Sequence, residues 1–379
     1  MVAAGQDSTR LSVLIDHFDN LTQPAFNQLL QALASQPISE LPEEQRLLIW
    51  DHLTKFTNKH RRFSDAEWAL PVELIARIEK VAVQLAPTNP FNLHQHLFAD
   101  DFDDYDEEGN WEEQQKRLET RRETAISEIF QQDGAEGVIR FAESVSSPGQ
   151  VGHALGVLAD SVIEQTFLPH FLNSADNKRK ALISGFIWRR YHLKGWEWCD
   201  DIDKSDWTPE QIGQFLAYLP FTKGAWDRAS EWLQVYESEY WTRTGANAHQ
   251  ADGHLVIAIE KLIEHGRPHA AINCLDRMRH AKQPIDSNQC VRALLAALTS
   301  SEPNYARAGY RIINLIKFLQ SEPSVSRDNL FIVEWAYVPL LARHRGAAPQ
   351  LLESRLANDP EFFCEVIRRI YRSKKKEQP

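Results

Sequence analysis

The sequence has few of the residues that interrupt regular structure and few cysteines. Its 379 residues include 16 glycines, 18 prolines and four cysteines, which are Cys199, Cys274, Cys290 and Cys364. No two cysteines form a Cys-x-x-Cys pair, and four cysteines in a chain of this length do not make a disulfide scaffold. We expect free thiols in a reducing cytoplasm, with Cys274 and Cys364 buried because each lies in an apolar helical pattern.

Long apolar runs and an excess of positive charge are also absent. No run approaches the roughly 20 apolar residues of a membrane-spanning helix, and residues 1–7 lack the pattern of a secretory signal. The formal net charge is −11, whereas nonspecific nucleic-acid binders carry a basic surface. We therefore expect a cytoplasmic protein, no membrane contact and no nucleic-acid partner. A nucleic-acid-binding helical repeat with a basic C-terminal arm, including Arg368 and Arg372, is an alternative.

The dominant pattern is the helical one, with apolar residues spaced three and four apart along nearly the whole chain. Examples are Leu48, Ile49, Leu53 and Phe56. The alternation of apolar and polar residues that is typical of strands is not found. The residue pairs that form the turn between two strands of a β-hairpin are not found in such a position either. The sequence therefore predicts an all-α protein of about 17 to 20 helices.

Cap-forming residues mark where several of these helices begin. Thr208 to Gln211 and Ser64 to Glu67 both have the spacing of a capping box. Asn89, Ser147 and Asp359 each precede a proline, the residue preferred in the first helical turn. The glycines Gly149, Gly152 and Gly156 follow one such start, and close packing between helices explains them better than a phosphate-binding loop.

Residues 98–113 contain nine acidic residues and no basic one. Adjacent carboxylates repel each other, which favours an extended, solvated linker, followed by a long charged helix from about Asn110 to Gln132. We therefore divide the chain into four parts. They are an N-terminal helical block at 1–97, the acidic linker at 98–113, a Trp-rich central block at 114–245 and C-terminal repeats at 246–379.

Pairs of helices recur in the C-terminal part. Between His254 and Met278 one helix ends near Gly266 and the next begins with small residues, which is similar to a tetratricopeptide unit. Stacked units of this kind form an α-solenoid, each burying its apolar stripe against its neighbours. The sequence predicts such an α-solenoid of tetratricopeptide- or HEAT-like pairs, with a compact helical bundle as the alternative.

Seven of the 11 tryptophans lie within 54 residues of one another. Tryptophan joins a large apolar area to one N–H donor and is enriched at binding hot spots. We take this stretch as a candidate surface for binding another protein, although bulky rings also fill the space between packed helices. The candidate residues are Trp188, Trp196, Trp198, Trp207, Trp226, Trp232 and Trp241.

The motifs of common enzymes are missing. There is no Gly-x-x-x-x-Gly-Lys-Ser/Thr loop, no Gly-x-Ser-x-Gly elbow and no His-Glu-x-x-His. The sequence therefore predicts no catalytic residue, no metal and no cofactor. His94 and His96 with Asp100 or Asp101 are a weaker metal alternative, because an extended segment could bring them to one ion.

One alternative enzyme class is kept open. Asp200, Asp201 and Asp203 lie beside Trp196 and Trp198, and a glycosidase needs two carboxylates across an aromatic cleft. The same residues also suit a polar turn that precedes the cap at Thr208. The rival function is therefore an all-α, glycosidase-like hydrolase.

Two blocks resemble the helical-repeat regions of very large bacterial proteins. They run from Arg46 to Pro71 and from Asp359 to Ile367. The resemblance is to the C-terminal sensor regions of STAND-type NTPases in antiviral defence. It implies a helical sensor or scaffold that recognises a phage or host protein. The nucleotide-binding loop of that family is missing here, so the resemblance also implies a piece of a larger protein.

Overall fold

The chain is helical throughout the part that is described. The computed structural model describes residues 7–99, 110–251, 253–302 and 308–371, and these contain 21 α-helices and no strand. This confirms the predicted all-α class, and three of the helices are only four residues long. The helices group into two compact units, Met1–Ile202 and Asp203–Pro379. Most of the predicted acidic linker, at 100–109, lies outside the described residues, and the predicted domain boundaries stay predictions.

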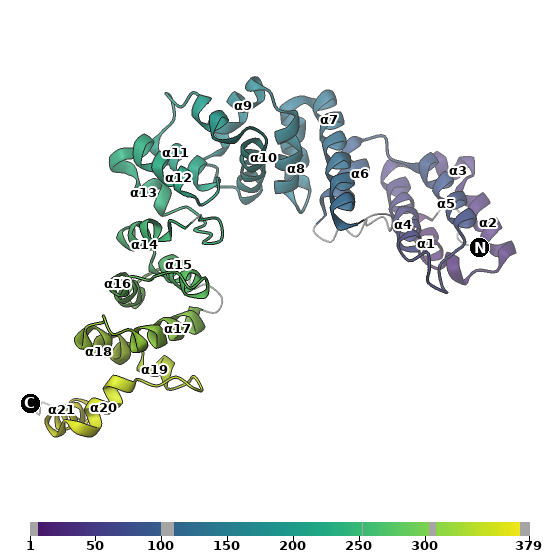
Figure 1. Cartoon of the computed structure of the whole chain (residues 1–379). Coiled ribbons are helices and arrows are strands. Elements are labelled where there is room, and N and C mark those ends of the chain that lie inside the picture. The colour runs from purple at the N-terminus through teal and green to yellow at the C-terminus, as the bar shows by residue number, and fades with distance from the viewer. Residues whose placement is uncertain (1–6, 100–109, 252, 303–307, 372–379) are drawn as a thin grey trace, which may run out of the picture. The chain divides into compact units, whose positions relative to one another are not determined.

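The first unit contains ten α-helices in its described part (Figure 1). Their bounds are α1 Ser8–Ile15, α2 Gln23–Leu33, α3 Gln36–Ser39, α4 Glu43–Arg62, α5 Val72–Leu85, α6 Pro90–His94, α7 Trp111–Ser144, α8 Pro148–Leu158, α9 Ser161–Phe171 and α10 Asn177–Asp201. Helices α1, α2, α4 and α5 enclose one apolar core. The largest rings in that core are Phe18, Phe26, Trp50 and Phe56.

Two long helices of this unit are interrupted by glycine. In α7 the backbone of Gly134 has φ 64° and ψ −158°, and in α10 Gly195 has φ 68° and ψ −160°. Residues other than glycine rarely adopt this left-handed backbone conformation, so each glycine permits a break in the helix. The helix predicted from Asn110 to Gln132 is therefore confirmed, and the chain continues past the break to Ser144.

Helices α8 and α10 approach each other through glycines. A Cβ added to Gly152 would lie 1.8 Å from the carbonyl oxygen of Leu182, and one added to Gly185 would lie 2.0 Å from the carbonyl oxygen of Gly149. Both atoms belong to the backbone and cannot move aside. Close helix packing, which the sequence predicts for Gly149, Gly152 and Gly156, is confirmed.

The second unit contains the other eleven α-helices. Their bounds are α11 Pro209–Ala217, α12 Lys223–Arg228, α13 Ser238–Trp241, α14 Leu255–Glu264, α15 Pro268–His280, α16 Ser287–Ala297, α17 Ala308–Ser321, α18 Arg327–Ala336, α19 Val338–Leu341, α20 Gln350–Asn358 and α21 Pro360–Ile370. A π-helical turn, Ala229–Leu233, follows α12.

From α14 onwards, helices pack on those that follow closely in the sequence. Helix α14 contacts α15 and α16, α15 contacts α16 and α17, and α16 contacts α17 and α18 (Figure 1). Gly266, with φ 72°, ends α14 in a Schellman turn in which Arg267 N–H donates to the carbonyl of Leu262. The helix pair predicted between His254 and Met278 is thus present as α14 and α15.

Two glutamates hold this succession together by capping helices that are distant in the sequence. The Glu302 carboxylate accepts hydrogen bonds from the backbone N–H groups of His269 and Ala270, at 2.7 and 3.3 Å, at the start of α15. In the same way Glu334, which is fully buried in α18, accepts from Leu352 N–H at 2.8 Å at the start of α20. Each carboxylate satisfies N–H groups that lack a partner within their own helix.

Three of the five predicted caps are confirmed. Ser147 precedes α8 as predicted, but its side chain makes no cap hydrogen bond, and the cap predicted at Ser64 is wrong. Thr208 and Gln211 form the reciprocal capping box, and Asn89 and Asp359 each accept from a backbone N–H of the helix they precede. Ser64 begins no helix, because residues 63–71 form turns between α4 and α5. The hydrogen bond of Leu70 N–H to His60 Nδ1 closes this connection.

Three cysteines are buried, and Cys364 is exposed on α21. The burial predicted for Cys274 is therefore confirmed and that predicted for Cys364 is wrong. Burial raises the pKa of the Cys274 and Cys290 thiols to about 12. Both thiols therefore stay protonated at neutral pH and are poor nucleophiles.

The contact between α8 and α10 predicts a contrast between two neighbouring glycines. We expect Gly152→Ala to lower the free energy of unfolding by about 1–3 kcal/mol, because the added methyl group meets backbone. A Cβ at Gly149 would lie 3.5 Å from its nearest neighbour, so Gly149→Ala is the control, with a change below about 1 kcal/mol. Equal losses in urea unfolding of the two variants would contradict the packing described.

His60 predicts a pH dependence of stability. Its ring is fully buried between Phe56 and Trp68, and burial lowers its pKa below the ordinary 6.5. As the pH falls, His60 is therefore protonated near pH 6.5 in the unfolded chain and only at a lower pH in the folded chain. The stability that His60 contributes is complete above about pH 7.5 and is lost as the pH falls through 6.5 towards the lower folded pKa.

Urea unfolding of the wild type and of His60→Asn at about pH 8 and pH 5.5 measures this effect. The difference between the two proteins is expected to be smaller at the lower pH. A difference that does not change with pH would show that His60 is not the group responsible.

Candidate functional site

The three candidate tryptophans of the first unit all lie on α10, in two environments. Trp198 is buried, and its indole N–H donates to Glu164 Oε1 at 3.0 Å. Glu164 also pairs with Arg190, which is almost fully buried. Trp188 and Trp196 are half-buried, and their rings contact His192 and Tyr191, respectively.

In the second unit, two of the four candidates form a buried aromatic cluster. Trp226 and Trp241 lie with ring centroids 6.1 Å apart, and both pack against Phe221. The other two are half-buried: Trp207 packs on Phe215, and Trp232 has the Lys204 ammonium 4.5 Å from its ring centre.

None of the seven tryptophans is mainly exposed. Trp198, Trp226 and Trp241 fill the interior, and the other four are half-buried. The large exposed indoles are elsewhere, at Trp68, Trp111 and Trp335. The concentration of tryptophan in the sequence therefore corresponds mostly to packing between helices, and the candidate surface must be sought around the exposed rings.

The three acids of the rival hydrolase lie at the end of α10 and just beyond it. All are exposed. Asp203 accepts from Ser205 N–H at 3.0 Å, and hydrogen bonds from Ser205 lower the pKa of its carboxyl. A glycosidase acid needs a raised pKa at neutral pH, so Asp203 has the chemistry of a turn residue rather than of a general acid.

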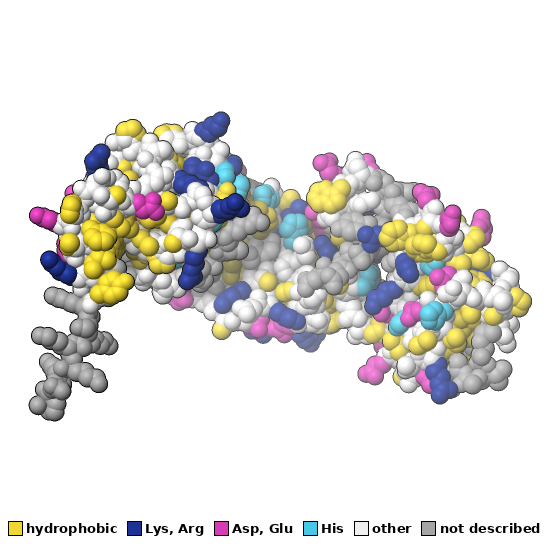
Figure 2. All heavy atoms as spheres, turned by 90° about the horizontal axis from the view of Figure 1, so that it is seen from below, with side chains coloured by type: hydrophobic (Ala, Val, Ile, Leu, Met, Phe, Trp, Pro, Cys, Tyr) yellow, Lys and Arg dark blue, Asp and Glu magenta, His cyan; other side chains and the backbone are white. Residues whose placement is uncertain are grey.

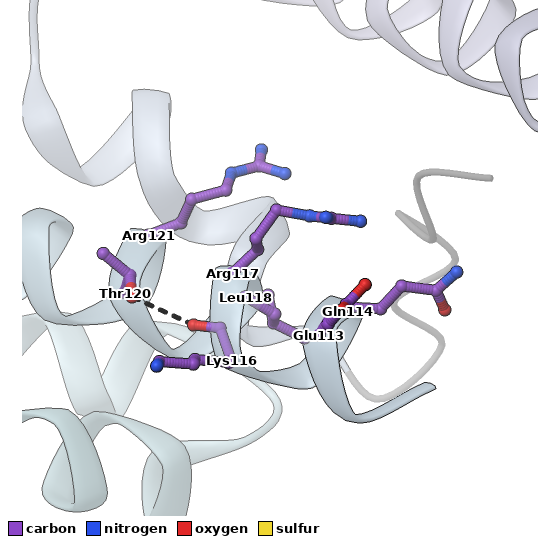
Figure 3. Close-up of a pocket in the computed structure, with 7 residues that line it drawn as sticks. All are labelled: Glu113, Gln114, Lys116, Arg117, Leu118, Thr120 and Arg121. Carbon is purple, nitrogen blue, oxygen red and sulfur yellow. Dashed lines mark hydrogen bonds between the residues drawn. The ribbon is translucent and has the colours of Figure 1, made fainter. Parts of the chain in front are cut away.

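The first unit has a cavity of about 530 Å³ along the start of α7, lined by charged residues (Figure 3). Arg117 and Arg121 extend from the same side of this helix, one turn apart, and Lys116 points in another direction. A second cavity of about 400 Å³ shares Thr120 and Arg121 and extends to Trp50. Arg117 and Arg121 both also interact with other groups of the chain.

His94, from the metal alternative, lines that second cavity and pairs with Glu128 at 2.7 Å. Asp100 and Asp101 lie outside the described residues, so the proposed set is not tested. Within the described ranges there is no group of three or more histidine, cysteine, aspartate or glutamate side chains placed to hold a metal ion.

An exposed apolar surface lies at the C-terminal end of the second unit, between α18 and α21. Hydrophobic side chains gather there in the left part of Figure 2. They surround a cavity of about 290 Å³, which we call the C-terminal groove. It is lined by Phe331, Ile332, Trp335, Phe362, Glu365 and Val366.

The groove is built by helical spacing on both of its walls. Phe331 and Trp335 are one turn apart on α18, and Phe362 and Val366 are one turn apart on α21. The rings of Phe331 and Phe362 meet edge to face at 5.5 Å. The Arg355 guanidinium lies 4.9 and 4.4 Å from the centres of these two rings, and such cation–π contacts fix the position of the aromatic wall.

Exposure distinguishes the rim of the groove from its floor. Ile332 and Trp335 are 49% and 46% exposed, whereas Val366 is 9% exposed. Sequence reasoning missed this surface because it gave weight to the local density of tryptophan. The available signal was helix α21, in which Phe362, Phe363, Val366 and Ile367 make an apolar arc too wide for one neighbour to cover.

Comparisons with protein-family models, with curated proteins and with solved structures found no match for this chain. No helix in the described part of the chain combines the length and the apolar character needed to cross a membrane. The functional argument therefore rests on the geometry of the described residues.

The placement of the tryptophans predicts a contrast in stability. We expect Trp241→Ala to lower the free energy of unfolding by about 3–5 kcal/mol, because this ring is 1% exposed and the substitution leaves a cavity. Trp335→Ala is the matched variant and is expected to cost less than about 2 kcal/mol, since nearly half of its ring already contacts water. Urea unfolding measures both, and a larger loss at Trp335 would reverse the assignment of core and surface.

Proposed function

We propose that this chain is a helical-repeat scaffold or sensor that binds another protein through the C-terminal groove. The observation that carries the proposal is the exposed aromatic rim at Ile332 and Trp335, beside a cavity that is already formed. Interface hot spots are enriched in tryptophan and lie where a ring can be fully desolvated by a partner.

The size of the groove favours a protein segment over a small molecule. Small-molecule sites have volumes of about 300–1,000 Å³ and bury most of their ligand. A cavity of about 290 Å³ with an exposed rim suits one or two apolar side chains projecting from a larger partner. Glu365 is the charged residue of the lining, and it gives the partner a polar contact beside the apolar ones.

The arrangement of the helices supports the repeat part of the proposal. Contacts from α14 to α18 join neighbours in the sequence, as expected when helix pairs stack into an α-solenoid. The two capping glutamates, Glu302 and Glu334, tie successive helices together and keep the register of such a stack.

The biological setting is proposed from the sequence resemblance. One of the two resembling blocks, from Asp359 to Ile367, forms most of α21 and supplies one wall of the groove. We propose that the chain acts as a sensor region in bacterial antiviral defence, and that the groove takes a phage or host protein. The three exposed acids near Trp198 have no part in this function.

Site-specific photo-crosslinking in the native cells tests the proposal. A photoreactive amino acid is placed at Ile332, on the rim, and in a control protein at Val83, which is 75% exposed on α5. We expect one protein adduct, identified by mass spectrometry, at Ile332 and not at Val83, and expect Trp335→Glu to abolish it. A sensor role further predicts that the adduct appears when phage infects the cells.

Two results would contradict the proposal. One is the absence of any adduct at Ile332 in both infected and uninfected cells. The other is the same set of adducts at Ile332 and Val83, because two unrelated exposed positions would then report only random collision.

A further inference from the structure

Helix α21 and Tyr371, the residue that directly follows it, carry a second exposed apolar surface, on a different side from the C-terminal groove. Phe363, Ile367 and Tyr371 are 49%, 38% and 75% exposed and follow each other at intervals of one helical turn. Cys364, also exposed, lies beside them. We call these four residues the α21 stripe.

Helix geometry separates the stripe from the groove. At 100° per residue, Ile367 lies about 100° around the helix from Val366, which lines the groove, while Glu365 lies about 100° from Val366 in the opposite direction. The groove opens on the side of Glu365 and the stripe on the side of Ile367. A partner could therefore occupy the stripe and leave the groove open.

The spacing of the stripe is that of a coiled-coil seam. Cys364, Ile367 and Tyr371 recur at three and four residues, as the seam positions of a heptad do, and Phe363 flanks them. In a stack of helix pairs each apolar stripe is covered by the next helix, and end helices are normally polar outside. The seam residues Cys364, Ile367 and Tyr371 remain exposed within the described chain.

The charges at the edge of the stripe are self-complementary. Glu361 and Arg368 are seven residues apart, so they lie on the same edge of α21, and both are exposed. When two such helices run antiparallel, like edges meet, and Glu361 of each faces Arg368 of the other. This gives two opposite-charge pairs about a two-fold axis, and the two helix dipoles also oppose each other.

We infer that the α21 stripe binds a second copy of this chain, as an antiparallel helix pair about a two-fold axis. A closed two-fold dimer is the commonest assembly of soluble proteins and needs exactly such a self-complementary patch. One short helix from each chain makes a small interface, at the lower end of specific ones. We therefore expect a reversible dimer with a Kd of about 1–100 µM.

Sedimentation velocity of the full chain over a range of concentrations is the test, with two charge variants and their mixture. The wild type is expected to shift from monomer to dimer as its concentration rises. Glu361→Lys and Arg368→Glu each create like-charge contacts at the interface, and each is expected to weaken dimerisation at least tenfold. An equimolar mixture of the two variants restores opposite charges across the interface and is expected to recover the dimer.

A second measurement uses the native thiol as a reporter. A short bifunctional maleimide is expected to join two wild-type chains through Cys364, because the other three cysteines are buried. Ile367→Ser, a seam substitution at an exposed position that leaves Cys364 in place, is expected to abolish the crosslink. Its fold is checked by circular dichroism.

A wild type that stays monomeric up to about 100 µM would overturn the inference. A dimer that persists in Glu361→Lys, in Arg368→Glu and in Ile367→Ser would overturn it as well, because the interface would then lie elsewhere. Failure here leaves the proposed function untouched, since photo-crosslinking at Ile332 reports on the groove and not on the stripe.

Discussion

Every helix in this protein has to cover its apolar stripe, because no sheet is present in the described chain to provide a second kind of layer. Burial of these stripes contributes a large part of the stabilising free energy, at about 25 cal/mol for every Å² of apolar surface removed from water. In the N-terminal core four helices cover one another around Phe18 and Phe56. From α14 to α18 the same task is met by the neighbouring helices in the sequence. Helix α21 has more apolar surface than its described neighbours cover, as the exposure of Phe363 and Ile367 shows.

The closest contacts between helices occur at glycines, and two helix starts are capped by carboxylates from other parts of the chain. Gly152 and Gly185 allow α8 and α10 to approach until backbone meets backbone. Gly134 and Gly195 allow long helices to break and resume in another direction. Glu302 and Glu334 then accept hydrogen bonds from N–H groups at the starts of α15 and α20. These positions fix the spacing and the ends of the helices, and the large apolar residues fill the space that results.

Local features of the fold were well predicted from the sequence. Helical periodicity gave the all-α class, and the caps at Thr208, Asn89 and Asp359 mark true helix starts, because a cap depends on residues three or four apart. Ser64 has the same local pattern but begins no helix, since the chain there is held in turns and Leu70 bonds to His60. A local rule fails where a contact with a neighbouring helix, beyond the span of the cap, decides the backbone.

The candidate site could not be predicted in the same way, because exposure depends on which helix lies opposite. Trp226 and Trp335 look alike in the sequence, yet Trp226 meets Phe221 and Trp241 in the interior, whereas Trp335 is 46% exposed. Cys364 was expected to be buried for the same reason: its helix is apolar over an arc that a single neighbour does not cover. The width of that arc on α21 was the one sequence signal for both the groove and the stripe.

The central claim is that the recognition surface is the exposed rim at Trp335, and that the tryptophans of the central stretch are mainly structural. Fluorine NMR of the full chain labelled with 5-fluorotryptophan tests it directly, with each signal assigned by single substitution. The account predicts a clear shift between H₂O and D₂O for the Trp335 signal and almost none for Trp226 and Trp241. A protected Trp335 together with solvent-exposed signals from Trp226 and Trp241 would contradict it.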